Sequence, residues 1–389
     1  MIGSRPRGGR LLAFALLVAV CAPWTPAGRA AAATVTGRAS AAAGWDSNPL
    51  EWTALEHRRG DAFTRIDGAL LWADGGEGAG WTAEARWAAE RYLRERGENR
   101  HLVLFSLSRR SAGREHWLQP FFQVSARFFP QYIPPEETLG GSRGNRDVLR
   151  LETGAQGGSN AGALAILWSA RLVGLRKEAV RELPEAEEYE TGAGRIGRSR
   201  AAAAIAGEAR WPGLHGWQPF LTAQASGIAY ERDAVESQTG GQPVEEGARR
   251  RDAVVEAGAG IARAGSPSLR AGFAYEKTWS NSLGVGFQRL RLDLSAGLLL
   301  TRETSAQLLI CWHPYSRYDD EARLIDPYED PDDPEFGERN RIVLGLRRPL
   351  AGGFAAEVQA GWHRNEAVVS FEDYEKTVYQ IGLSYETAE

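Results

Sequence analysis

The feature that most constrains the fold of this chain is an alternation of apolar and polar residues with a period of two. Between Phe354 and Trp362, for example, every second residue is apolar, and Glu357 and Gln359 lie between them. The ranges 81–90, 288–300 and 379–385 repeat the pattern. Because successive side chains of a β-strand point to opposite faces, each such segment is predicted to be a strand with one apolar and one polar face.

The same pattern along the whole chain predicts about sixteen strands. They lie near 34–43, 62–72, 81–92, 100–109, 116–129, 147–156, 161–173, 195–211, 217–230, 250–263, 269–279, 286–300, 305–314, 340–348, 353–364 and 376–386. Several are longer than the strands of ordinary globular sheets and match the length that a tilted strand needs to cross a bilayer. The predicted fold is all-β, a transmembrane antiparallel up-and-down β-barrel.

The connections between these segments alternate in length along the chain. Short, turn-like connections follow even-numbered segments, at 157–160, 212–216, 264–267 and 349–352. The long connections all follow odd-numbered segments, at 44–61, 130–146, 174–194, 231–249 and 315–339. Outer-membrane barrels have short periplasmic turns and long external loops, whereas a soluble β-sandwich has no reason to sort its loops in this way. This alternation favours a barrel of the bacterial outer membrane.

Aromatic residues gather near both ends of the predicted strands. Those at the short-turn ends are Trp72, Trp81, Trp211, Trp217, Phe354 and Tyr385, and those toward the long loops are Phe63, Phe128, Tyr275, Trp279, Trp312 and Trp362. Two rows of rings at the height of the lipid headgroups are typical of membrane barrels. The alternative is that aromatic residues simply favour strands.

The polar faces carry charges in the middle of the strands, which a water-filled interior can solvate. A closed barrel of about sixteen strands encloses such an interior. The candidates for lining the pore are Arg270, Arg289, Arg291, Asp293, Arg341, Arg347, Glu84, Glu152, Glu256 and Glu357. Charged pore walls bias the passage of ions. The alternative is that these residues form a structural network of arginine–carboxylate pairs that braces a filled interior.

The first 33 residues have the layout of a secretory signal peptide. Basic residues precede the apolar run Leu11 to Val20, and small residues end the segment at Ala33. We expect cleavage before Thr34, so that residues 34–389 form the mature barrel. Cys311 is then the only cysteine left, and we expect it to be a small apolar residue, buried or facing lipid. No apolar stretch is long enough for a transmembrane helix.

The chain carries no recognisable catalytic, cofactor or metal motif. It has no phosphate loop, no cysteine and histidine residues at metal-ligand spacing, and no dinucleotide fingerprint. His363 is the one histidine expected to face inward at mid-membrane, with Glu357 and Gln359 on the same face. We therefore predict no enzyme activity, no cofactor and no metal site. The acidic segment 315–340 is interpreted as a solvated surface loop rather than a calcium site. The net charge of −4 argues against a nucleic-acid partner.

The chain resembles bacterial outer-membrane β-barrel proteins as a class, over residues 34–389. The stretch Gly44-Trp45-Asp46-Ser47-Asn48-Pro49 is similar to one in the barrel domain of surface lipoprotein assembly modifiers, although turn chemistry also explains it. The apolar residues of 379–385 resemble a terminal assembly strand. The resemblance implies outer-membrane lipid, lipopolysaccharide and the barrel-assembly machinery as partners. It leaves a homo-oligomer open.

Strand number and the charged inner face together predict a passive or weakly selective porin-like channel for ions and small solutes. The alternative is a surface-assembly, export or adhesion barrel that presents its long loops to a partner.

Overall fold

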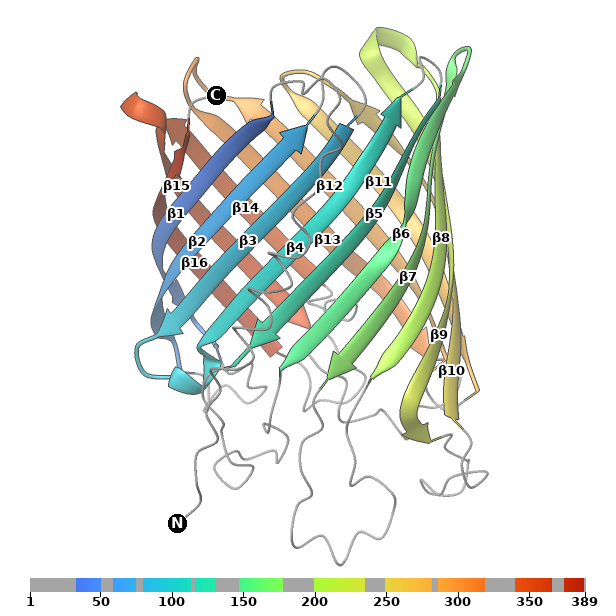
Figure 1. The fold of residues 1–389 in the computed structure, drawn as a ribbon, viewed down its shortest axis with the longest axis horizontal. Coiled ribbons are helices and arrows are strands. Elements are labelled where there is room, and N and C mark those ends of the chain that lie inside the picture. The colour runs from blue at the N-terminus through green and yellow to red at the C-terminus, as the bar shows by residue number, and fades with distance from the viewer. Residues whose placement is uncertain are drawn as a thin grey trace, which may run out of the picture.

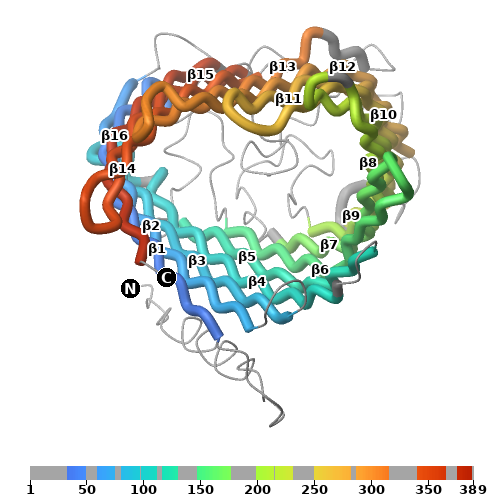
Figure 2. The backbone as a smooth tube through the Cα atoms, turned by 90° about the horizontal axis from the view of Figure 1, so that it is seen from above, coloured from blue at the N-terminus to red at the C-terminus, as the bar shows by residue number. Residues whose placement is uncertain are grey.

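The computed structural model describes residues 33–49, 59–74, 80–112, 116–129, 147–177, 199–234, 249–281, 286–318, 340–365 and 374–387. They form one closed antiparallel barrel in which every strand pairs with its neighbours in the sequence and β1 pairs with β16 (Figures 1 and 2). The strands are β1 (Thr34–Asp46), β2 (Asp61–Asp74), β3 (Gly80–Tyr92), β4 (Arg100–Ala112), β5 (His116–Phe128), β6 (Val148–Ala161), β7 (Leu164–Lys177), β8 (Arg200–Arg210), β9 (Trp217–Ala234), β10 (Arg249–Arg263), β11 (Ser268–Ser280), β12 (Phe287–Leu299), β13 (Ser305–Tyr318), β14 (Asn340–Pro349), β15 (Phe354–Asn365) and β16 (Tyr374–Glu386).

The predicted fold is confirmed, and each predicted segment corresponds to one strand. The described connections contain the short 3-10 helices η2 (Arg96–Glu98), η4 (Leu214–Gly216) and η5 (Ala351–Gly353). No helix among the described residues is long and apolar enough to cross a membrane. The predicted signal peptide and the acidic loop fall almost entirely outside the described residues.

One predicted turn is wrong. Residues 157–160 lie inside β6, and the turn to β7 consists of Gly162 and Ala163. Gly157 and Gly158 are needed for packing instead, because a Cβ atom there would overlap the rings of Trp168 and Trp117. Gly162 has a φ of 62°, a left-handed conformation that two-residue hairpin turns require and glycine adopts freely.

The alternation in loop length is confirmed by the strand bounds. The connections 162–163, 211–216, 264–267, 300–304 and 350–353 follow even-numbered strands, whereas 129–147, 178–199 and 319–339 follow odd-numbered ones. We call the two ends of the barrel the short-turn rim and the long-loop rim. β1 begins and β16 ends at the short-turn rim, as a barrel with periplasmic termini requires.

The outer face of the barrel is apolar. Ile66, Leu172, Ile205 and Ile381 are each more than half exposed although they lie in the middle of their strands. Side chains of this kind would be costly in water, and lipid is the surrounding that accommodates them over a whole sheet. The apolar side chains therefore form the surface that contacts the membrane.

Aromatic rings lie on this outer face near both rims. Trp312 and Trp362 stack with ring centroids 5.9 Å apart near the long-loop rim, and Phe354 and Tyr385 pack at 5.0 Å near the short-turn rim. Phe63 does not belong to the outer row, because it is 4% exposed and packs against Tyr92 inside the barrel.

The segment Gly44 to Asn48 joins the first strand to the last. The backbone N–H of Ser47 donates to the Thr377 carbonyl (2.9 Å), and the N–H of Thr377 donates to Ser47 Oγ (2.8 Å). Asp46 Oδ1 accepts from the Asn48 N–H (2.9 Å), the geometry of an Asx turn. Asn48 is 1% exposed. This segment therefore fastens the seam between β1 and β16 at the long-loop rim.

Candidate functional site

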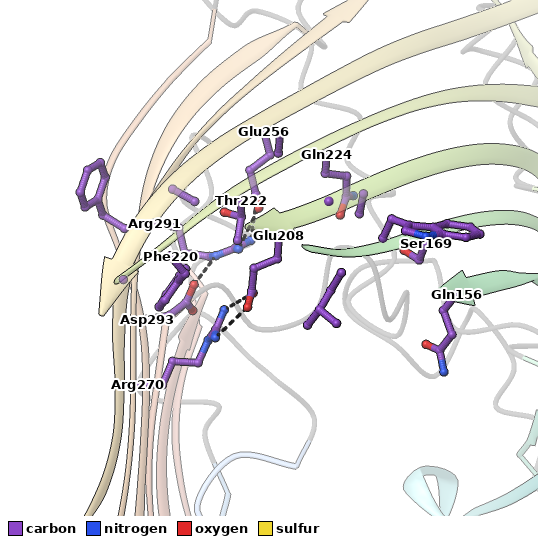
Figure 3. Close-up of a pocket in the computed structure, with 18 of the residues that line it drawn as sticks. Gln156, Ser169, Glu208, Phe220, Thr222, Gln224, Glu256, Arg270, Arg291 and Asp293 are labelled. Carbon is purple, nitrogen blue, oxygen red and sulfur yellow. Dashed lines mark hydrogen bonds and ion pairs between the residues drawn. The ribbon is translucent and has the colours of Figure 1, made fainter. Parts of the chain in front are cut away.

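Ion pairs that reach across intervening strands identify the concave face of the barrel. Arg270 on β11 donates from Nη2 to Glu208 Oε2 on β8 at 2.6 Å, although β9 and β10 lie between the two strands (Figure 3). Neighbouring strands are about 4.8 Å apart, so these backbones are about 14 Å apart along the sheet. Side chains on the convex face would diverge over that span. Arg270 and Glu208 therefore lie on the inner wall.

A second cluster lies beside the first on the same wall. Arg291 on β12 binds Glu256 on β10 (Nη1 to Oε2, 2.8 Å) and Asp293 on its own strand (Nε to Oδ2, 2.7 Å). Arg289 pairs with Glu276 on β11 at 2.9 Å. Each of these guanidinium groups is fixed by at least one carboxylate, a strong and directional charge-assisted contact.

The other pore-lining candidates lie on the same face, and most of them are also paired. Arg347 pairs with Glu357 (3.3 Å), which also contacts Arg38 across β16 (3.4 Å). The remaining pairs are Glu84 with Arg86, and Glu152 with Arg150 (2.9 Å) and Arg171 (3.7 Å). Arg341 is the exception, because it pairs with no carboxylate in the described part of the chain. The structure thus contains the arginine–carboxylate network that the sequence left as an alternative.

Two residues adjoin Arg341 on the inner wall. Cys311 on β13 is directly opposite Arg341 on β14. On its other side, Cys311 is directly opposite Asp293 on β12. The expectation of a buried or lipid-facing cysteine is wrong, because the strand parity that places Asp293 inside also places Cys311 there, and Cys311 is only half-buried. His363 lies opposite Arg341 and Lys376.

No group of three or more histidine, cysteine or acidic residues is arranged to hold a metal ion among the described residues.

The two ion-paired clusters border a hollow in the inner wall of about 400 Å³, which we call the inner-wall hollow (Figure 3). Gln156 and Ser169 lie across it from Arg291 and Asp293. Thr222 and Gln224 of β9 also line it. Gly272 on β11, an inner position opposite Asp293, also lines it.

Phe220 is an aromatic side chain of the inner wall. It is 5% exposed, and its ring lies over Gly260 and Gly272, where a Cβ atom would crowd it. The Arg270 guanidinium lies 3.9 Å from the ring centroid, a cation–π contact that fixes its position. Sequence reasoning missed Phe220 and the neutral residues of the hollow because only charged residues were considered. The shared parity of Phe220, Thr222 and Gln224 could have identified them.

A further network lies on the inner face near the long-loop rim. Arg250 binds Asp252 at 2.8 Å, and their side chains are 6% and 3% exposed. The Tyr230 hydroxyl donates to Asp252 Oδ2 (3.1 Å), and the Arg250 guanidinium lies 4.4 Å from the Tyr230 ring centroid. Both side chains are more deeply buried than those of the other ion pairs named above.

Comparison with protein-family models and with curated proteins finds no match. Solved structures with a similar fold include a bacterial polysaccharide outer membrane secretin (9% identity, TM-score 0.39, covering 91% of this chain and 98% of that one). CdiB from Acinetobacter baumannii has 10% identity and a TM-score of 0.45, covering 90% of this chain and 60% of that one. A loop-deletion mutant of OmpT, an outer membrane protein of Vibrio cholerae, has 10% identity and a TM-score of 0.37, covering 92% and 100%.

The barrel wall is closed, apolar on its outer face and charged on its inner face. Only a closed barrel or helices satisfy the backbone in lipid, and barrels of this type belong to the outer membrane. The chain is therefore a β-barrel protein of the bacterial outer membrane.

Proposed function

We propose that the barrel is a weakly selective channel for ions and small polar solutes. The observation that carries the proposal is the charged inner wall of a sixteen-strand barrel, identified by the ion pair between Arg270 and Glu208. Strands spaced about 4.8 Å apart and tilted by about 40° give a backbone diameter of about 30 Å for this number of strands. Barrels of this size enclose an aqueous passage.

The pairing of charges supports weak rather than strong selectivity. A permeating ion meets Arg291 together with Glu256 and Asp293, so the fields of the opposite charges largely cancel within a few ångströms. Arg341 is the exception, and its field should give the pore a modest preference for anions. The ten candidates from the sequence are proposed as the charged part of this pore lining.

Planar-bilayer recording of the purified barrel tests the proposal. We expect stepwise conductance increases in potassium chloride and a reversal potential that indicates a slight anion preference in a salt gradient. Arg341→Glu should move the reversal potential toward potassium. Arg348→Glu is the matched control, because Arg348 lies on the opposite face of β14 and is 65% exposed. A barrel that inserts but never raises the conductance would refute the proposal.

The alternative of a surface-assembly, export or adhesion barrel gains no specific support from the described residues. Asp46, Ser47 and Asn48, whose sequence suggested it, make hydrogen bonds within the barrel. The long loops that would meet a partner lie largely outside the described residues.

A further inference from the structure

The charged groups around the inner-wall hollow neutralise one another. Glu208 is bound by Arg270 and Arg210, and Glu256 and Asp293 are both bound by Arg291. A small anion would have to displace a carboxylate from a guanidinium group, and a cation would have to displace the guanidinium. Neither exchange is favoured, since the existing contacts are short and two of them, Arg270 with Glu208 and Arg291 with Glu256, are bidentate. The hollow is therefore poorly suited to hold an ion.

Several neutral side chains with hydrogen-bonding groups line the hollow, and Gln156 among them donates to Gln119 Oε1 at 3.3 Å. Ser169, Thr222 and Gln224 also face the hollow, and none of these three makes a hydrogen bond to another described residue. A hydroxyl group both donates and accepts, and an amide offers two donors and one acceptor oxygen. All three side chains are half-buried, so a solute in the hollow can reach them while bulk water has limited access. They present matched donors and acceptors without net charge.

The carboxylates that line the hollow offer further hydrogen-bond acceptors. A carboxylate has about four acceptor positions, so Glu208, Glu256 and Asp293 can accept hydrogen bonds beyond those from their arginines. The volume of about 400 Å³ falls within the range of small-molecule sites, about 300–1,000 Å³.

We propose that the inner-wall hollow binds a neutral polyhydroxylated solute, such as a short saccharide, as it passes through the barrel. Adjacent hydroxyl groups donate and accept at every carbon, which complements the mixture of amide, hydroxyl and ion-paired groups in the hollow. The inference rests on the proposed channel function and specifies the class of solute that this channel holds. Binding of this kind concentrates the solute in the pore and narrows the passage for ions while the solute is bound.

Current block by maltose tests the proposal. We expect maltose, added to one side of a bilayer containing open channels, to reduce the potassium chloride current in a saturable manner. A polyethylene glycol of similar mass is the size control, since its ether oxygens accept hydrogen bonds but do not donate them. Thr222→Val and Gln224→Leu keep the shape of the side chains. Together they should raise the half-blocking maltose concentration about tenfold, as expected for the loss of one or two hydrogen bonds.

Gln123→Leu is the matched control variant. Gln123 lies on the inner face of β5, opposite Glu152 and outside the hollow, and its replacement should leave maltose block unchanged. The proposal is overturned if maltose reduces the current no more than the glycol does. It is also overturned if the half-blocking maltose concentration is the same for the variant at Thr222 and Gln224 as for the original protein.

A second measurement separates failure of this inference from failure of the channel. Saturation-transfer NMR with maltose and the barrel in detergent micelles needs no ion conduction. Transfer that disappears in the variant at Thr222 and Gln224 but persists with Gln123→Leu would support the site even if no current flows. Absence of saturation transfer from the original protein to maltose would overturn the inference. It would not bear on the proposed channel function, which the conductance recording tests separately.

Discussion

Asp252→Asn should strongly destabilise the barrel although it replaces only one carboxylate oxygen with an amide NH₂ group. The Asp252 carboxylate binds Arg250 and accepts from the Tyr230 hydroxyl. A second guanidinium, that of Arg200, lies 5.9 Å from the Tyr230 ring centroid. Asparagine keeps the shape of the side chain and can still accept from Tyr230. The substitution therefore removes a buried negative charge beside the Arg250 guanidinium.

The magnitude follows from the burial of the pair. Arg250 and Asp252 are 6% and 3% exposed, so water does little to solvate the Arg250 guanidinium once the Asp252 charge is removed. Removing one partner of a buried ion pair costs about 3–5 kcal/mol. Because the asparagine side chain would retain a hydrogen bond to the guanidinium, we expect about 3 kcal/mol, or roughly a hundredfold in the unfolding equilibrium constant.

Urea unfolding of the barrel in lipid vesicles, followed by tryptophan fluorescence, measures this loss. Glu303→Gln is the matched control, since it makes the same carboxylate-to-amide change in a pair with Arg348 at 3.9 Å. Both of those side chains are about two-thirds exposed, and such pairs contribute about 0–1 kcal/mol. Equal losses for Asp252→Asn and Glu303→Gln would refute the reasoning, because burial would then make no difference to the value of the charge.

Three further predictions concern the two faces and the seam. A membrane-impermeant, negatively charged methanethiosulfonate should modify Cys311 in the inserted barrel and lower its anion current; mass spectrometry that finds the thiol unmodified would contradict an inward-facing Cys311. Leu344→Arg, on the outer face, should cost about 2–4 kcal/mol in urea unfolding, whereas Val343→Arg on the inner face should cost much less; equal costs would contradict the assignment of faces. Ser47→Ala removes the hydroxyl that accepts from the Thr377 N–H and should lower the temperature at which the folded band disappears on a gel, by an amount equivalent to about 1 kcal/mol. An unchanged temperature would mean that the seam does not depend on this contact.

The fold could be predicted from the sequence because a membrane barrel requires strict alternation along every strand. The strand near Phe354 to Trp362 needed no tertiary information, since its period of two already separates a lipid face from a water face. The turn predicted at 157–160 was wrong because glycine there serves packing under Trp117 and Trp168. Local sequence cannot distinguish a glycine that bends the chain from one that makes room for a neighbouring ring.

The inner wall was predictable residue by residue, but its contacts were not. Alternation places Arg270 and Glu208 on one face, but only the curvature of the closed sheet brings them together across two strands. Phe63 was wrongly assigned to the outer rings because the assignment considered its position near a strand end and not the face on which its place in the alternation puts it. Arg65 and Asp67, two and four residues further on, already marked that face of β2 as polar.

The seam also bears on how the molecule is assembled. Every neighbouring pair of strands other than β1 and β16 is consecutive in the chain, so each can form as a hairpin or as an extension of one. The contact between Ser47 and Thr377 joins residues of the first and the last strand region, and ordering so long an intervening chain costs more entropy than closing any single loop. Formation of an open, curved sheet should therefore precede the meeting of its two edges. Until that meeting, both edges would expose unpaired backbone groups, and Asn48 and Asp46 would become buried only in the final step of folding.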